Sequence, residues 1–153
     1  MNSFIKKLKK EEKIKITEPS QEICFAYLEK SEKSLISAKT LTKIENYDDA
    51  VALTYYSMYY CSLALLYKIG IKSENHTATI ILLKEFFKID NKKLQEAKKE
   101  RVDKQYYTDF KATKEDVKKG IIIAEEFNTE IREKIATLKK TEIQKIQEKI
   151  KQL

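Results

Sequence analysis

Hydrophobic residues gather in one stretch of this chain, residues 49–70 (DAVALTYYSMYYCSLALLYKIG), whereas the other segments are amphipathic. No charged residue lies between Asp49 and Lys68, and apolar or aromatic residues occupy every side of the helix that this stretch predicts. A helix of this kind has to be covered all round. We therefore predict that it is the most buried helix of a bundle, with part of its surface left for a second subunit. Gly70 suits the left-handed residue that ends a helix.

The main alternative for this stretch is a membrane span, because its length is near the lower limit for one. Six of its uncharged residues are Tyr or Cys, and Thr54, Ser57 and Ser62 add hydroxyl groups. A membrane span would carry more Leu, Ile and Phe, with Tyr only at its ends. We therefore expect no contact with a membrane.

The remaining pattern predicts four further helices, over residues 21–44, 76–87, 92–107 and 117–138. Ser20 and Asn75 are candidate N-caps, and Thr113 with Asp116 resembles a capping box. The short turn at 46–48 makes the first two long helices antiparallel neighbours. Residues 71–75 are expected to form a loop. The predicted fold class is all-α, an up-and-down helical bundle of about five helices.

A short segment flanks the predicted bundle at each end. Residues 1–18 combine six lysines with Ile5 and Leu8, which indicates a short amphipathic helix that either docks on the bundle or stays mobile. Residues 140–153 carry a narrow apolar stripe that either extends the last helix or folds back as a separate one. The predicted organisation is a basic arm (1–18), a bundle (19–139) and an amphipathic tail (140–153).

The chain contains only two Gly and one Pro, which is typical of long helices and short connections. Gly120 lies inside the last long helix, where glycine costs about 1 kcal/mol relative to alanine. The expected reason is a close approach of the central helix, which would need the space.

Cysteine usage indicates a reducing compartment. Cys24 and Cys61 both lie in apolar helical patterns, and a chain of 153 residues that is poor in loops does not resemble a disulfide-stapled scaffold. We expect two free thiols in a cytoplasmic protein. We also expect no signal peptide, because the first 15 residues carry charge with no apolar run behind them.

The formal net charge is +7, and the basic excess falls on residues 1–18 and 88–119. Such charge can attract nucleic acid or an acidic protein. A solvated lysine-rich surface explains it equally well, so both alternatives stay open.

Motifs for metal or phosphate chemistry are absent from the sequence. It has no glycine-rich phosphate loop, no Cys/His cluster with metal spacing and no nucleophile elbow. His76, the single histidine, stands at a predicted helix start and is expected to be structural. We predict no metal site and no cofactor.

Four segments of this chain together carry the motifs of one known family. Residues 50–66, with the run Thr54-Tyr55-Tyr56-Ser57-Met58-Tyr59-Tyr60, are similar to an "AYYAMFHAARALL" helix, and His76 with Phe86 is similar to an "H…F" helix. Residues 101–106 (RVDKQY) resemble an Arg-x-x-x-Asp-Tyr signature, and residues 123–127 resemble a final "A-x-x-F". In this order the four segments resemble the HEPN domain family, with the third similar to the signature of an archaeal and bacterial branch.

The resemblance implies an all-α bundle that forms a homodimer through the central and fourth helices. Many members of the family are RNases, the toxins of toxin–antitoxin pairs whose partner is a minimal nucleotidyltransferase. Their active site uses an Arg, four to six spacer residues and a His, and two such motifs meet in the dimer cleft. There the Arg would stabilise developing phosphate charge and the His would move the proton.

This chain departs from that pattern at the His. With four spacers after Arg101 the position is Tyr106, and with six it is Thr108. A tyrosine hydroxyl, with a reference pKa near 10, is a poor proton shuttle at neutral pH. Arg101 can still bind a phosphate as a bidentate fork, or it can pair structurally with Asp103 or Asp49.

The leading hypothesis is therefore a non-nuclease binding module that acts with a nucleotidyltransferase or binds a nucleotide or RNA. The candidate ligand-binding residues are Arg101, Lys104 and Asp49. The first alternative is an RNase with a substituted active site, for which the catalytic candidates are Arg101, Tyr106 and Tyr107, with His76 as a distant base. The second alternative is a structural dimeric helical protein without a ligand.

Overall fold

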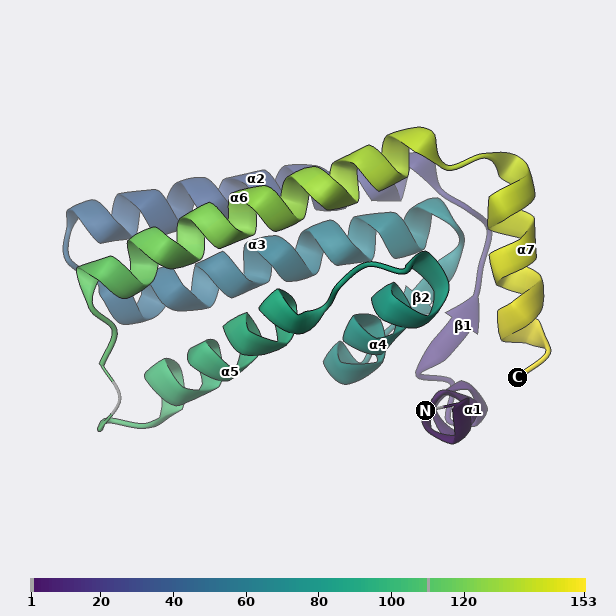
Figure 1. Cartoon of the computed structure of the whole chain (residues 1–153), viewed down its shortest axis with the longest axis horizontal. Coiled ribbons are helices and arrows are strands. Elements are labelled where there is room, and N and C mark those ends of the chain that lie inside the picture. Colours follow the sequence, from purple (N-terminus) through teal and green to yellow (C-terminus); the bar gives the residue numbers. More distant parts are fainter. Residues whose placement is uncertain (1, 110) are drawn as a thin grey trace.

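The computed structural model describes residues 2–109 and 111–153, and these form an all-α chain with one small sheet. Three long helices lie side by side: α2 (Gln21–Lys43), α3 (Tyr47–Lys68) and α6 (Lys114–Thr137) (Figure 1). The shorter helices α4 (His76–Phe87) and α5 (Lys92–Tyr106) also contact α3. Since α3 touches all four of these helices, it is the centre of the bundle, as predicted.

Burial confirms the special position of α3. Fourteen of its residues are buried, more than in any other described helix. Leu53, Tyr56, Tyr60 and Tyr67 are only half-buried, so one side of α3 remains partly open. No helix in the described ranges is both long and apolar enough to cross a membrane.

The predicted helix starts are confirmed by their caps. The Ser20 hydroxyl accepts a hydrogen bond from the amide of Ile23, and the Asn75 side chain accepts one from the amide of Ala78. Thr113 and Asp116 form the reciprocal bonds of a capping box. These bonds satisfy amide groups that have no partner inside the helix.

The prediction of a loop at 71–75 is wrong for its first three residues. Strand β2 (Ile71–Ser73) pairs antiparallel with β1 (Ile14–Ile16), with Ile16 opposite Ile71. Gly70 adopts a φ of 78°, which turns the chain out of α3 and into β2. Ile14 and Ile71 are both buried, so the sheet closes one end of the core. The pairing joins two segments that are far apart in sequence, so no local sequence pattern predicts it.

Both terminal segments dock on the bundle as separate elements. Helix α1 (Asn2–Lys10) buries Ile5 and Leu8, which selects docking over mobility for the arm. The last long helix ends at Thr137, and α7 (Lys140–Lys151) folds back separately beside α1 (Figure 1). Lys9 Nζ donates hydrogen bonds to the carbonyls of Ile150 (3.0 Å) and Lys151 (2.8 Å). The described chain therefore has seven helices, so the count of about five is not confirmed.

The division into arm, bundle and tail stays a prediction. Ile5 from α1 and Ile150 from α7 belong to the same hydrophobic cluster as the core of α3. The ends of the chain thus contribute to one continuous core.

Gly120 does lie nearest to α3, but close approach does not require it. A Cβ atom built at Gly120 would have the Thr54 methyl group as its nearest neighbour, 3.5 Å away. That is an ordinary van der Waals distance, so alanine would fit. The expected packing reason for this glycine is therefore wrong.

Candidate functional site

Tyrosines of α3 form an aromatic cluster that other helices approach. Tyr55 and Tyr59, one turn apart, are buried, and their ring centroids lie 6.0 Å apart. Tyr56 and Tyr60, also one turn apart, are half-buried, with centroids 5.8 Å apart. Because side chains at i and i+4 share a helix face, the run from Tyr55 to Tyr60 builds two adjacent aromatic pairs.

Arg101 of α5 lies over the first of these tyrosines. Its guanidinium carbon is 5.3 Å from the ring centroid of Tyr55 and 5.4 Å from that of Tyr56. Its Nη1 donates a hydrogen bond to the Tyr56 hydroxyl at 3.0 Å. Its Nε is buried and has no hydrogen-bond partner in the described part of the chain. Arg101 is thus oriented by rings rather than by a carboxylate, and it keeps unused hydrogen-bonding capacity.

His76, the first residue of α4, approaches the same tyrosines from another element. Its Nδ1 lies 2.7 Å from the hydroxyl oxygen of Tyr55. Its ring stacks on that of Tyr59, with centroids 3.9 Å apart and planes inclined by 8°. The Asn75 cap fixes the start of α4 and therefore the position of His76.

We call Tyr55, Tyr56, Tyr59, His76 and Arg101 the Arg–His cluster. Burial lowers the pKa of His76, and the positive charges of Arg101 and Lys98 lower it further. Lys98 lies one turn before Arg101 on α5, and its Nζ donates a hydrogen bond to Thr77 at 3.0 Å. Two cations of α5 therefore lie close to the N-terminus of α4, where an anion would be stabilised.

Tyr55 stays protonated at all ordinary pH values. Burial raises its pKa well above the usual range, and the neighbouring Tyr59 adds to this, whereas Arg101 opposes it. With His76 neutral as well, either the Tyr55 hydroxyl donates to Nδ1 or Nδ1–H donates to the hydroxyl oxygen. In the first arrangement Nε2 of His76 carries the proton and is a donor. In the second it is an unprotonated acceptor and could serve as a base.

Of the predicted ligand-binding and catalytic residues, the structure places one, Arg101, near His76. Arg101 lies in the Arg–His cluster, whereas Tyr106 and Tyr107 lie at the end of α5 with 66% and 56% of their surface exposed. Lys104 Nζ donates a hydrogen bond to the carbonyl of Lys111 at 3.2 Å. Asp49 is exposed in the first turn of α3, where its carboxylate accepts a hydrogen bond from Asn46.

Sequence reasoning overlooked Tyr55, Tyr59 and Lys98 as site residues. The spacing of Lys98 and Arg101 already predicts one shared helix face. The contact of that face with Tyr55 depends on how α5 lies against α3, which the local pattern does not contain. His76, expected to be structural, packs on Tyr59 but also bonds to the tyrosine that Arg101 covers.

The cysteines are not part of this cluster. Cys24 and Cys61 are buried free thiols, which confirms the prediction that they are unpaired. Burial raises the pKa of Cys61 to about 12, so its thiol is not nucleophilic at neutral pH. Within the described ranges, no group of three or more His, Cys, Asp or Glu side chains could hold a metal ion.

Comparison with known families decides the membership of the chain. The model of the HEPN domain matches residues 26–135, which include α3, α4, α5 and most of α6. The chain belongs to the HEPN domain family. The resemblance inferred from the four sequence segments is thereby confirmed.

Two curated relatives support this HEPN assignment over shorter stretches. A protein of Methanocaldococcus jannaschii, named "Putative toxin MJ0142", is 44% identical over 62 residues, which are 40% of this chain and 42% of that protein. The UPF0332 protein glr0978 of Gloeobacter violaceus is 34% identical over 55 residues, which are 36% of this chain and 44% of that protein. The alignments thus span less than half the length of each relative.

Proposed function

We propose that this HEPN protein is a non-nuclease binding module that recognises a phosphate group of a nucleotide or RNA through Arg101. The observation that carries the proposal is the state of Arg101, which is held over two tyrosine rings and forms an ion pair with no carboxylate in the described part of the chain. A guanidinium fork that no carboxylate occupies is suited to a phosphate. Lys98 and the N-terminus of α4 add to the positive potential nearby.

The absence of a histidine at Tyr106 supports a role without cleavage. Tyr106 is five residues beyond Arg101, which is about 140° around a helix of 3.6 residues per turn. Arg101 packs against α3, where its Nη1 donates to the Tyr56 hydroxyl, whereas Tyr106 is largely exposed. Within one chain the two side chains therefore do not form an Arg–base pair.

The proposal includes a homodimer and a partner protein. The half-buried side of α3, with Leu53, Tyr56 and Tyr60, is suited to form the dimer interface together with α5. The name of the M. jannaschii relative contains the word toxin. This supports a place in a toxin–antitoxin pair, with a minimal nucleotidyltransferase as the partner and the cytoplasm as the compartment.

One observation favours a second candidate, an RNase with a substituted active site. The Tyr55 hydroxyl connects His76 to the ring that Arg101 covers, so a possible base lies near the phosphate-binding Arg without being its neighbour in sequence. This candidate requires an unprotonated Nε2 on His76, because a general base has to accept a proton. The non-nuclease module requires no such state.

A binding and cleavage assay with a labelled single-stranded RNA tests the proposal. We expect the wild type to bind the RNA without cleaving it, and the binding to weaken as the salt concentration rises, since phosphate contacts release counterions. Arg101→Ala should lower the affinity while helicity is kept. Arg101→Lys should lower it too, because one ammonium group cannot reproduce a two-pronged contact. Arg132→Ala is the matched control, since it removes the same charge from α6.

Three outcomes would count against the proposal. Cleavage by the wild type that both Arg101→Ala and His76→Asn abolish would establish the RNase instead. Equal binding by the Arg101→Ala and Arg132→Ala variants would mean that the RNA recognises overall charge rather than this site. Loss of the dimer in Arg101→Ala, with no RNA binding by the wild type, would make Arg101 a structural residue. Tyr106→His restores the Arg-to-His spacing of the RNase members and is expected to gain weak cleavage only as a dimer, in which two copies of the motif meet.

A further inference from the structure

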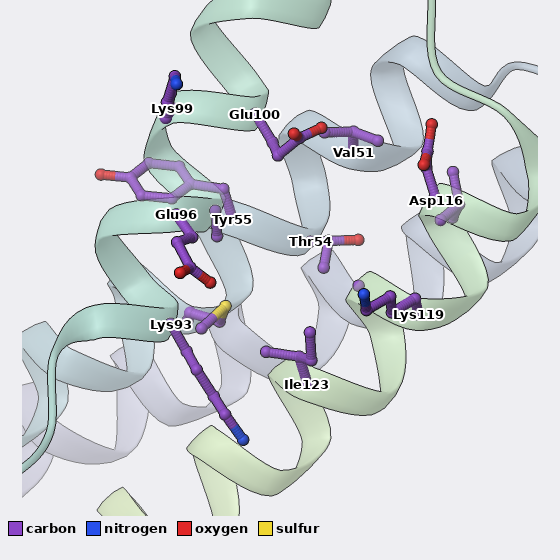
Figure 2. Close-up of a pocket in the computed structure, with 14 residues that line it drawn as sticks. Val51, Thr54, Tyr55, Lys93, Glu96, Lys99, Glu100, Asp116, Lys119 and Ile123 are labelled. Atoms are coloured by element: carbon purple, nitrogen blue, oxygen red, sulfur yellow. The ribbon is translucent and has the colours of Figure 1, made fainter.

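A cavity of about 380 Å³ lies between α3, α5 and α6, and of the Arg–His cluster only Tyr55 lines it (Figure 2). Cavities that bind small molecules in proteins commonly have about 300–1,000 Å³. The ring of Tyr55 lines this cavity, while its hydroxyl points away from α6 in Figure 2 and bonds to His76. Arg101 is not among the lining residues, so the cavity is a separate site.

Gly120 of α6 is one of the residues that line the cavity. The backbone does not explain this glycine, since Gly120 is not among the residues with a positive φ. Packing does not explain it either, because a Cβ would have only the Thr54 methyl group nearby, at 3.5 Å. The helix therefore carries a residue that costs about 1 kcal/mol relative to alanine, and the missing side chain leaves space in the wall of the cavity.

The interior of the cavity is apolar. Its walls are formed by Val51, Met58, Val117 and Ile123, together with the Tyr55 ring. The Thr54 hydroxyl already donates to the carbonyl of Ala50 at 2.8 Å. A ligand with a polar body would lose hydrogen bonds to water here without replacement. The aromatic ring and the thioether of Met58 favour contact with a flat aromatic body.

The rim of the cavity is polar and carries both signs of charge. Glu96 and Glu100 project from α5, and Lys119 lies opposite on α6 (Figure 2). Two other rim residues are held by neighbours: Lys93 pairs with Glu126 at 3.3 Å, and Asp116 accepts the amide of Thr113. Lys99 of α5 also lines the cavity. The α5 side of the rim thus offers two carboxylates beside a lysine, and the α6 side offers the ammonium group of Lys119. Such a rim does not select an anion, but it suits an edge that both donates and accepts hydrogen bonds.

We propose that this cavity binds a flat, uncharged heteroaromatic molecule of the size of a nucleobase. The aromatic faces of the ligand lie against the apolar walls. An amino group on its edge donates to Glu100, and a ring nitrogen accepts from Lys119. The site is independent of the phosphate contact proposed for Arg101, because the ligand needs no phosphate.

Adenine and indole are the two probes that test this site. They have a similar bicyclic shape, but adenine both donates and accepts along its edge, whereas indole only donates. We expect adenine to shift the amide NMR signals of Ala97, Gly120 and Ile123. A site that hydrogen-bonds a polar edge rejects an analogue without it, so we expect indole to bind at least about tenfold more weakly.

Two variants and one competition measurement complete the experiment. Gly120→Leu places a side chain in the cavity and should weaken adenine binding at least about tenfold. Glu100→Met replaces an exposed acceptor by an apolar side chain of similar length and should weaken the binding of adenine but not that of indole. Added inorganic phosphate should leave the affinity for adenine unchanged, which separates this site from the proposed phosphate site.

The proposal is overturned if adenine shifts none of the three amide signals, or if indole binds as tightly as adenine. Unchanged adenine binding by a folded Gly120→Leu variant would also overturn it. If Gly120→Leu does not fold, Glu100→Met decides: equal loss for both probes, or no loss for adenine, contradicts the proposed edge contacts.

Discussion

At the scale of single residues, His76 combines two properties that a purely structural histidine would not need. It is stacked on Tyr59, and it is bonded to the phenol that Arg101 covers. Its pKa is lowered by burial first and by the charges of Arg101 and Lys98 second. The protonation of His76 therefore reports on both the packing and the occupancy of the Arg–His cluster.

The lowered pKa of His76 makes stability depend on pH in a defined direction. Unfolded His76 has a pKa of about 6.5, and the folded value is lower. Between the two values the unfolded chain binds more protons, so the free energy of unfolding rises as pH rises through this window and this contribution is constant above it. Urea titrations from pH 5 to pH 8 should show that the wild type loses stability toward acid pH relative to His76→Asn.

The matched control for this measurement is Tyr55→Phe, which keeps the ring and removes the bond to His76. A stability difference between wild type and His76→Asn that does not change over this pH range would contradict the lowered pKa. Nitrogen NMR of His76 in the same samples identifies the tautomer. Protonated Nε2 supports the binding module, whereas unprotonated Nε2 supports the RNase candidate.

The chemistry of the site could be predicted from sequence only where one residue carries it. Arg101 stands in a recognisable motif, so the sequence alone is enough to single it out as a candidate. The importance of Tyr55 and His76 arises from the angle at which α4 and α5 meet α3, and this angle is set by core packing. Tyr106 and Tyr107 were chosen for their nearness to Arg101 in sequence, but the helical turn directs them elsewhere.

At the scale of elements, the helices follow from the sequence and the short strands do not. The caps at Ser20, Asn75 and Thr113 define helix starts by bonds within a few residues. The pairing of β1 with β2 depends on a partner more than fifty residues away, so no window along the chain contains it. For the same reason, the sequence alone does not decide whether α1 and α7 dock on the bundle.

The two glycines provide a matched test of element-level reasoning. Gly120→Ala should raise the free energy of unfolding by about 1 kcal/mol, because alanine is the better helix former and its Cβ fits beside Thr54. Gly70→Ala should lower it by at least about 1 kcal/mol, since a φ of 78° is strained for an L-residue. Its Cβ would also clash with the carbonyl of Thr17. Chemical denaturation of both variants measures the two changes, and a destabilised Gly120→Ala would mean that α6 packs more tightly against α3 than described.

At the scale of the whole molecule, the half-buried side of α3 is the feature that one chain leaves unexplained. The other sides of this helix are covered by α2, α4, α5 and α6. Leu53, Tyr56, Tyr60 and Tyr67 remain half-buried along the open side. An apolar and aromatic stripe of this kind, on the most buried helix, is typical of a surface that a second subunit covers.

We therefore expect sedimentation to show a dimer at micromolar concentration. Tyr60→Lys should produce a folded monomer, because Lys30 already lies 4.7 Å from the centre of the Tyr60 ring and a second cation would repel both it and the partner. Ile36→Lys is the matched control, since Ile36 is a large apolar residue on α2 with 61% of its surface exposed, away from the stripe. A wild-type monomer would remove the dimer from the proposed function. Dissociation by Ile36→Lys but not by Tyr60→Lys would move the interface from α3 to α2. The Arg–His cluster would then have to bind the proposed phosphate ligand without a second copy of the chain beside it.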